Sequence, residues 1–139
     1  MVRLDMAAPE RWRILAVEDD PTNRLLLRAM LGRAPEPRLR DAVIDEAPTL
    51  AAARRALADG RVDLLLLDVR LPDGDGLDLA REVIALGPDR PRILVMSASV
   101  LPAERDAAVA AGCDGFLAKP YRAEEFFAAL REVSGVDGA

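Results

Sequence analysis

Histidine is absent from this chain of 139 residues, and cysteine and lysine each occur once, as Cys113 and Lys119. The absence of histidine excludes a Ser-His-Asp or Cys-His catalytic unit, histidine-based zinc chemistry and a role as a phosphohistidine donor. A single cysteine can form neither an internal disulfide nor a metal site. The reactive groups that remain are carboxylates, hydroxyls and one ammonium group, because every basic residue except Lys119 is an arginine.

The chain also lacks long apolar runs and clusters of basic residues. No apolar run approaches the length of a membrane span, and the N-terminal sequence MVRLDMAAPERW lacks the apolar core of a signal peptide. The net charge of −5 argues against electrostatic binding to nucleic acid. We therefore expect a cytoplasmic protein whose partners include neither a membrane nor a nucleic acid.

What the sequence contains is a regular alternation of apolar and amphipathic segments. Its length suits one domain, which we place at residues 13–133, between an N-terminal extension (1–12) and a C-terminal tail (134–139). Short apolar runs predict five strands, and helical spacing of apolar residues predicts five helices. The strands are expected at 13–17, 42–47, 62–68, 92–98 and 114–119, and the helices at 21–31, 50–60, 77–86, 102–112 and 122–133. Segments 32–41 and 69–76 are expected to be loops.

Strands that alternate with helices favour a parallel sheet covered by helices on both faces. The segment VDLLLLD (62–68) agrees with this arrangement, because a continuous apolar run is typical of a strand buried on both faces. In such sheets, ligands bind at the carboxyl ends of the strands. The side chains at these strand ends are therefore the candidates for chemistry.

Several acidic residues are expected at this edge of the sheet. The sequence Glu-Asp-Asp (18–20) follows the first strand, Asp68 ends the third, Ser97 ends the fourth and Lys119 ends the fifth. Carboxylates packed together repel one another and favour a hard cation, and oxygen ligands suit Mg²⁺ or Mn²⁺. A carboxylate beside such an ion can attack phosphorus, while the ion and Lys119 neutralise the transferred group. We therefore predict that Asp68 is the reactive centre.

Four motifs in this order and spacing resemble the receiver domains of bacterial two-component response regulators. They are ILAVEDDPTNR (14–24), LLLLDVRLPDGDG (64–76), ILVMSAS (93–99) and GFLAKP (115–120). The resemblance implies an α/β fold of flavodoxin-like, doubly wound (βα)5 topology, with a five-stranded parallel sheet of order 2-1-3-4-5. It also implies a phosphoacceptor switch that uses Mg²⁺ (or Mn²⁺). A sensor histidine kinase or a histidine phosphotransfer protein would donate the phosphoryl group, and a downstream protein partner would respond.

The resemblance also assigns roles to particular residues. Glu18 and Asp19 match the acidic pair that binds the metal, Asp19 directly and Glu18 through water. Asp68 matches the phosphoacceptor, and the backbone carbonyl of Arg70 would be a further metal ligand. Lys119 matches the lysine that pairs with the phosphate.

Further positions match residues that respond to phosphorylation or set its lifetime. Ser97 matches the switch serine or threonine, and Phe116 matches the aromatic switch position, although Phe116 also suits the core. The Lys-Pro bond at 119–120 is typically cis in this family. Arg70 and Ser99 occupy the two positions that tune how fast water removes the phosphate.

Other residues with reactive or charged side chains are better explained by structural roles. Asp20 precedes Pro21 and suits a helix N-cap, as does Asp75 in the acidic run after the third strand. Cys113 is expected to be a small buried residue and not a reactive thiol. The helix at 102–112 is rich in alanine, so its packing energy is small and it suits a surface that shifts.

The predicted function is a phosphoacceptor signalling switch whose fourth helix, fifth strand and fifth helix change surface for a partner. It is not an enzyme beyond self-phosphorylation and autodephosphorylation. Only residues 134–139 follow the last helix, so we expect no output domain unless the chain is part of a larger protein. One alternative is a receiver domain cut from a hybrid histidine kinase, since PTNR (21–24) is similar to those receivers.

Two rival hypotheses place the chain in a different class of protein. The first is a Mg²⁺-dependent phosphatase with an aspartyl nucleophile, although such enzymes usually carry an acid where Arg70 stands. The second is an interaction module that is never phosphorylated. Turnover of a phosphate ester would favour the first, and failure of a small phosphodonor to modify Asp68 would favour the second.

Overall fold

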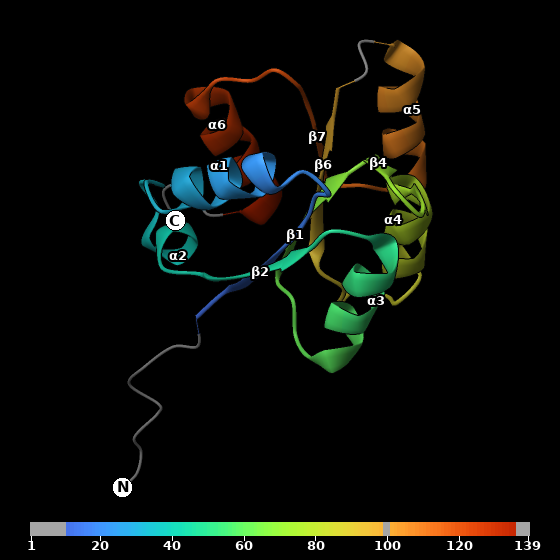
Figure 1. Cartoon of the computed structure of the whole chain (residues 1–139), viewed down its shortest axis with the longest axis horizontal. Helices are drawn as coiled ribbons and strands as arrows, with labels where there is room; N and C mark the ends of the chain where they lie inside the picture. Colours follow the sequence, from blue (N-terminus) through green and yellow to red (C-terminus); the bar gives the residue numbers. More distant parts are fainter. Residues whose placement is uncertain (1–10, 99–100, 136–139) are drawn as a thin grey trace, which may run out of the picture.

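A five-stranded parallel sheet lies at the centre of the structure, a computed structural model that describes residues 11–98 and 101–135 (Figure 1). Its strands are β1 (Arg13–Val17), β2 (Val43–Ala47), β3 (Leu64–Asp68), β6 (Arg92–Ser97) and β7 (Gly115–Ala118). They pair in the order β2-β1-β3-β6-β7, and every pair is parallel. If only the five strands of this sheet are numbered along the chain, β6 and β7 are the fourth and fifth, and the order is 2-1-3-4-5. This order confirms the predicted flavodoxin-like, doubly wound topology.

Helices cover both faces of this sheet. They are α1 (Pro21–Leu31), α2 (Pro37–Arg40), α3 (Leu50–Asp59), α4 (Gly76–Ile84), α5 (Pro102–Ala111) and α6 (Ala123–Ser134). Helices α1, α2 and α6 pack on one face, and α3, α4 and α5 pack on the other (Figure 1). Within the described part of the chain, no helix combines the length and the apolar character that a membrane span requires.

The burial of strand β3 explains its continuous apolar sequence. Leu64 and Leu66 pack into the core beneath α1 and α6, whereas Leu65 and Leu67 pack into the core beneath α3 and α4. All four side chains have 0% exposure, and each contributes about 1.5–3 kcal/mol by its burial. Asp68 is the polar residue that ends this strand, so the apolar sequence positions it firmly at the edge of the sheet.

Both predicted N-caps are confirmed. Asp20 Oδ1 accepts a hydrogen bond from the Thr22 N–H at 2.8 Å, and Pro21 stands in the first turn of α1. Asp75 Oδ1 accepts a hydrogen bond from the Leu77 N–H at 2.8 Å at the start of α4. Each carboxylate satisfies an N–H group that has no partner within its helix, which gives both acids a structural role.

The two predicted loops contain short regular elements, so the prediction was wrong in this respect. The segment 32–41 holds α2, which buries Leu39 fully in the core. The segment 69–76 holds an antiparallel hairpin of β4 (Arg70–Leu71) and β5 (Gly74–Asp75). Elements of two to four residues are too short to show a periodic pattern in a sequence, and it is tertiary contacts that stabilise them.

The turn of this hairpin is attached to α3. Asp73 accepts hydrogen bonds from the N–H groups of Leu50 at 2.8 Å and Ala51 at 3.0 Å, and these bonds hold the pKa of Asp73 below its ordinary value. Gly76 then brings the chain so close to Asp68 that a Cβ atom at position 76 would collide with the Asp68 carbonyl. The hairpin is thereby held against the strand end that carries Asp68.

Helix α5 buries few apolar side chains. Ala108 is the buried residue of α5, while Val109 is 66% exposed, in keeping with the alanine-rich sequence. Cys113 was expected to be a small buried residue, and the structure shows it half-buried. Burial raises the pKa of the Cys113 thiol to about 11, so the thiol is neutral at pH 7 and has low reactivity.

Parts of the predicted termini and one predicted tuning residue lie outside the described residues. They are residues 1–10 of the extension, residues 136–139 of the tail, and Ser99.

Candidate functional site

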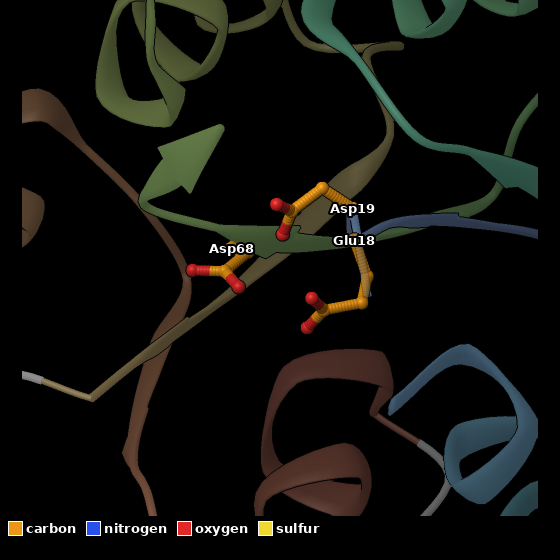
Figure 2. Close-up of side chains that lie close together, drawn as sticks. All are labelled: Glu18, Asp19 and Asp68. Carbon is orange, nitrogen blue, oxygen red and sulfur yellow. The ribbon is translucent and has the colours of Figure 1, made fainter. Parts of the chain in front are cut away.

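Three carboxylates meet at the carboxyl end of the sheet (Figure 2). Glu18 and Asp19 follow β1 and Asp68 ends β3, and these two strands are neighbours in the sheet. One oxygen from each carboxylate lies within 4.8 Å of the others. Glu18 is 1% exposed and Asp68 is 8% exposed, whereas Asp19 lies at the surface. The site is therefore open on the Asp19 side and closed beneath Glu18 and Asp68.

Lys119 lies between two of these carboxylates. Its Nζ donates hydrogen bonds to Glu18 Oε1 and to Asp68 Oδ2, each at 3.0 Å. The lysine side chain is 21% exposed. Burial by itself lowers the pKa of Lys119, but the hydrogen bond to Glu18 and the charge of Asp68 outweigh it, so the pKa is raised. The chain's one lysine ammonium group thus stays charged beside Asp68.

The backbone around Asp68 fixes the position of its carboxylate. The N–H of Arg70 donates to Asp68 Oδ1 at 3.2 Å, while Oδ2 faces Lys119. The Arg70 side chain lies at the surface. The peptide bond between Lys119 and Pro120 is cis, as the resemblance to receiver domains implied.

Ser97 also ends its strand at this edge of the sheet. It is 2% exposed and follows Met96, which stands opposite Asp68 in the register of β3 and β6. The N–H of Lys119 donates to the Ser97 carbonyl at 2.7 Å, so the ends of β6 and β7 are joined. The structure thus brings Ser97 to the strand ends that carry Asp68 and Lys119.

Phe116 lies away from the carboxylates. It pairs with Val95 in the register of β6 and β7 and packs partly buried against the core beneath α4. The guanidinium group of Arg105, on α5, lies 5.7 Å from the centroid of the Phe116 ring. The ring therefore links β7 to α5 without contributing a group to the carboxylate cluster.

Two residues beside the site were not among the sequence candidates. Tyr121 stacks on Phe126 with ring centroids 5.6 Å apart, and burial raises the pKa of its hydroxyl. Its signal in the sequence is its place directly after the Lys-Pro pair. Arg24 donates from Nη1 to the Glu18 carbonyl at 2.9 Å. No pattern predicted that contact, because the partners of Arg24 meet only in three dimensions.

The acidic side chains fit a hard divalent cation. Each of the three can offer one carboxylate oxygen, which is the ligand type that Mg²⁺ and Mn²⁺ prefer. Two of the three carboxylates are almost fully buried, and buried negative charges need a compensating cation. Lys119 supplies one positive charge against three negative ones, which leaves this edge of the sheet with a net attraction for cations.

Comparison with known proteins identifies the family. The family model of the response regulator receiver domain matches residues 14–131. The chain therefore belongs to this family. Receiver domains are signalling switches of two-component systems, generally without enzymatic turnover, and they interact with histidine kinases and downstream effectors.

Curated relatives of this receiver domain include response regulators named MprA. The protein from Mycobacterium leprae (strain TN) is 38% identical over 119 residues, which are 86% of this chain and 49% of that protein. The protein from Mycobacterium ulcerans (strain Agy99) is 37% identical over 119 residues, 86% of this chain and 48% of that protein. This receiver domain thus spans about half the length of the curated relatives that it matches.

Two solved structures similar to this receiver domain contain a divalent metal ion. The receiver domain of sensor histidine kinase PA1611 from Pseudomonas aeruginosa PAO1, with magnesium coordinated in its active-site cleft, is 30% identical. Its TM-score is 0.75, and the match covers 91% of this chain and 99% of that one. A Burkholderia pseudomallei response regulator with a phosphorylated aspartic acid and a calcium ion is 28% identical, with a TM-score of 0.74. That match covers 90% of this chain and 70% of that one.

Proposed function

We propose that Asp68 of this receiver domain accepts a phosphoryl group from a sensor histidine kinase or a histidine phosphotransfer protein. The observation that carries the proposal is the position of the Asp68 carboxylate, which lies beside the acidic pair Glu18–Asp19 and accepts a hydrogen bond from the ammonium group of Lys119 at 3.0 Å. In the transfer, an Asp68 oxygen bonds to phosphorus while the bond from phosphorus to the donor's imidazole nitrogen breaks, and the imidazole keeps the electron pair. The product is an aspartyl phosphate.

Mg²⁺ (or Mn²⁺) is the proposed cofactor. Glu18, Asp19 and Asp68 would hold it, with the backbone carbonyl of Arg70 as a further ligand. The ion supplies positive charge that neutralises the oxygens of the transferred group. The donor set of this chain supports the assignment, as does the magnesium ion in the similar PA1611 receiver domain.

Lys119, Ser97 and Phe116 are proposed to respond to the phosphoryl group. The Lys119 ammonium already bonds to Asp68 Oδ2, so it is placed to pair with a phosphoryl oxygen. Ser97 would donate to another oxygen, and the surface of α5, β7 and α6 would shift with Phe116. The weak packing of α5 supports this part of the proposal, because a helix with little buried area moves at small cost.

The proposed domain comprises residues 13–133 and acts in the cytoplasm on a protein partner. Similarity to MprA regulators and to receiver domains of sensor histidine kinases is compatible with two contexts. In one, the receiver domain signals to a separate protein. In the other, it is joined to further domains, as in the curated relatives of about twice its length.

A direct test is incubation of the purified chain with a small acyl phosphate and Mg²⁺, followed by intact-mass and peptide mass spectrometry. We expect the mass of one phosphoryl group, located on Asp68 and absent when EDTA replaces Mg²⁺. No gain in mass, or a phosphoryl group on another residue, contradicts the proposal. Multiple turnover of the acyl phosphate without a phosphorylated protein would instead favour a phosphatase.

A groove beside Lys119 is the proposed docking surface for the phosphodonor. It has a volume of about 380 Å³ and lies between α1 and the segment that follows β7, with Leu26, Met30 and Tyr121 in its walls. Leu26 is 53% exposed, although its side chain is large and apolar. An apolar wall next to the reactive edge suits a helical donor, since apolar contacts orient the donor's histidine.

Leu26→Asp is expected to slow phosphoryl transfer from a phosphohistidine protein by roughly tenfold, because it places a charge in the apolar contact. Phosphorylation by a small acyl phosphate should keep its rate, since a small donor does not need the groove. Leu25→Asp is the matched control: Leu25 is 68% exposed and does not line the groove. Equal slowing with both kinds of donor would show that Leu26 acts through the fold and not through docking.

A further inference from the structure

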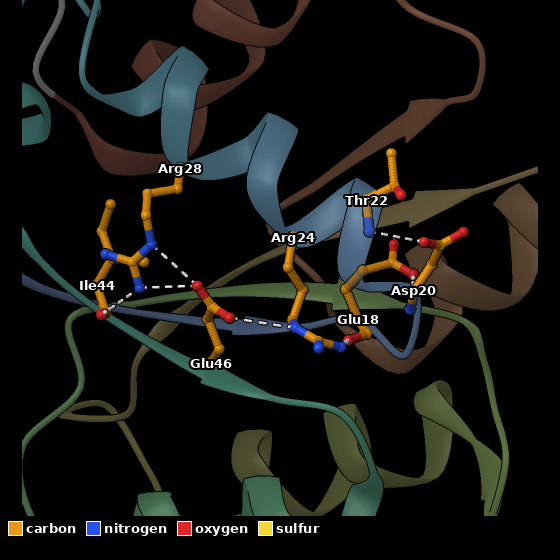
Figure 3. A network of polar contacts seen from close by, with 7 residues as sticks. All are labelled: Glu18, Asp20, Thr22, Arg24, Arg28, Ile44 and Glu46. Atoms are coloured by element: carbon orange, nitrogen blue, oxygen red, sulfur yellow. Dashed lines mark hydrogen bonds and ion pairs between the residues drawn. The ribbon is translucent and has the colours of Figure 1, made fainter.

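Arg24 connects the acidic pair to the neighbouring strand (Figure 3). From α1, its guanidinium group donates through Nη1 to the carbonyl of Glu18 at 2.9 Å and through Nε to Glu46 Oε1, on β2, at 3.1 Å. The Arg24 side chain is only 19% exposed, although arginine side chains near the start of a surface helix are usually exposed to solvent. One side chain therefore joins α1, the end of β1 and β2.

The anchor of this arrangement is Glu46. Its second oxygen, Oε2, accepts hydrogen bonds from Nε and Nη2 of Arg28 at 2.9 and 2.8 Å, while Arg28 Nη2 also donates to the Ile44 carbonyl at 3.2 Å (Figure 3). The hydrogen bonds from Arg28 and Arg24 hold the pKa of Glu46 below its ordinary value. Glu46 is thus ionised at neutral pH, and each of its two oxygens accepts hydrogen bonds from a different arginine.

The carbonyl that Arg24 holds belongs to the peptide unit between Glu18 and Asp19. A peptide unit is planar, so the direction of its carbonyl also sets the positions of both flanking Cα atoms. The N–H of Glu18 is held from the other side by the Ala47 carbonyl at 3.0 Å. Together these contacts leave the backbone of the acidic pair little freedom to rotate.

We infer that Arg24 is a positioning residue of the metal site, with Glu46 as its anchor. Arg24 bonds to none of the three carboxylates of the site. It acts by holding the Glu18–Asp19 peptide in the orientation that directs both side chains toward Asp68. The inference rests on the proposed metal site, and it adds two residues that the carboxylate cluster does not contain.

Positioning and charge predict opposite effects of removing Arg24. A guanidinium group near the carboxylates repels a divalent cation, so its removal by charge alone should tighten Mg²⁺ binding. If Arg24 orients the ligands, its removal should weaken binding, because groups that orient metal ligands typically change affinity by 10–100-fold. The sign of the change therefore separates the two effects.

Arg24→Met and Arg28→Met form a matched pair for this test. Both variants remove one positive charge and one partner of Glu46, and methionine keeps the helix and an apolar stem. Only Arg24 bonds to the Glu18 carbonyl, whereas Arg28 bonds to the carbonyl of Ile44. Calorimetric titration with Mg²⁺ should show about tenfold weaker binding for Arg24→Met and unchanged or slightly tighter binding for Arg28→Met.

A second readout needs no metal. Amide hydrogen exchange in the metal-free protein should quicken at residues 18–20 in Arg24→Met but not in Arg28→Met, with unfolding midpoints in urea measured for both. Glu46→Gln keeps the shape of the anchor and weakens its bond to Arg24, so amide exchange at residues 18–20 in the metal-free protein should quicken as in Arg24→Met but less. This variant also keeps the inference testable if Arg24→Met fails to fold.

The inference is overturned if Arg24→Met binds Mg²⁺ as tightly as Arg28→Met. In that case wild-type binding of Mg²⁺ and phosphorylation of Asp68 would still stand, and only the positioning role would be lost. If the wild-type chain binds no Mg²⁺ at all, the proposed metal site fails and the positioning role fails with it.

Discussion

Asp68→Asn is expected to abolish phosphorylation by both a small acyl phosphate and a phosphohistidine protein. Asparagine has nearly the same shape, and its amide oxygen can still accept the hydrogen bond from the Arg70 N–H. It lacks the carboxylate oxygen that attacks phosphorus, so no aspartyl phosphate can form. Intact-mass spectrometry after incubation with each donor and Mg²⁺ measures the effect.

Asp75→Asn is the control for a neighbouring carboxylate. Asp75 lies in the hairpin after Asp68 and caps α4, and asparagine caps helices as well as aspartate does. This variant should be phosphorylated like the wild type. A phosphoryl group that persists in Asp68→Asn but is lost in Asp75→Asn would move the acceptor to the hairpin and contradict the assignment.

Lys119→Met is expected to destabilise the metal-free protein and to slow phosphoryl transfer. It leaves Glu18 and Asp68 buried side by side without their shared ammonium group, and breaking a buried ion pair in this way costs about 3 kcal/mol. Transfer should slow on the order of 100-fold, because the charge that neutralises the transferred group is lost. Urea unfolding and mass-spectrometric time courses measure the two effects.

Magnesium should reverse part of the destabilisation in Lys119→Met. A divalent ion neutralises the same carboxylates, so saturating Mg²⁺ should raise the stability of the variant more than that of the wild type. If Mg²⁺ stabilises both proteins equally, the ammonium group and the ion do not share these carboxylates, and the proposed geometry of the site is wrong.

The stability difference between wild type and Lys119→Met also has a predicted pH dependence. The pKa of Lys119 is raised above its ordinary value of 10.5, so its contribution to stability is complete below that pH and is lost only as the pH rises through the folded-state value. The difference should therefore not shrink as the pH rises from about 6 to about 9. A difference that falls steadily across this range would contradict the ion pairs seen at Lys119.

The apolar sequence of β3 shows why the fold was predictable. Leu64 to Leu67 form a run without polar residues, and such a run, when it is only about four to eight residues long, is typical of a strand buried on both faces. Similar runs in β1 and β6 lead to the same conclusion, so the parallel sheet and its helical layers follow from local patterns. Helix α2 and the β4–β5 hairpin were not predictable, because tertiary contacts stabilise them: Leu39 of α2 is buried in the core, and Asp73 of the hairpin bonds to α3.

The candidate site was predictable only as a set of residue types at strand ends. Parallel strands bring their carboxyl ends to one edge, which is why Glu18, Asp19 and Asp68 were expected to meet. The sequence motifs that resemble receiver domains made that expectation specific, and the family match confirms the resemblance. Contacts made by Arg24 and Tyr121 were missed, because their partners lie on elements that no sequence pattern connects to them.

The sequence by itself determined the alternation of strands and helices, the strand that ends in Asp68, and the absence of histidine from the reactive groups, which leaves carboxylates, hydroxyls, one lysine and one thiol. These properties depend on local periodicity and composition, which a sequence displays directly. Only the tertiary structure decided that Lys119 bridges Glu18 and Asp68 and that Arg24 holds the Glu18 carbonyl. Such contacts join residues up to 101 positions apart, and their distances depend on how the strands and helices pack together.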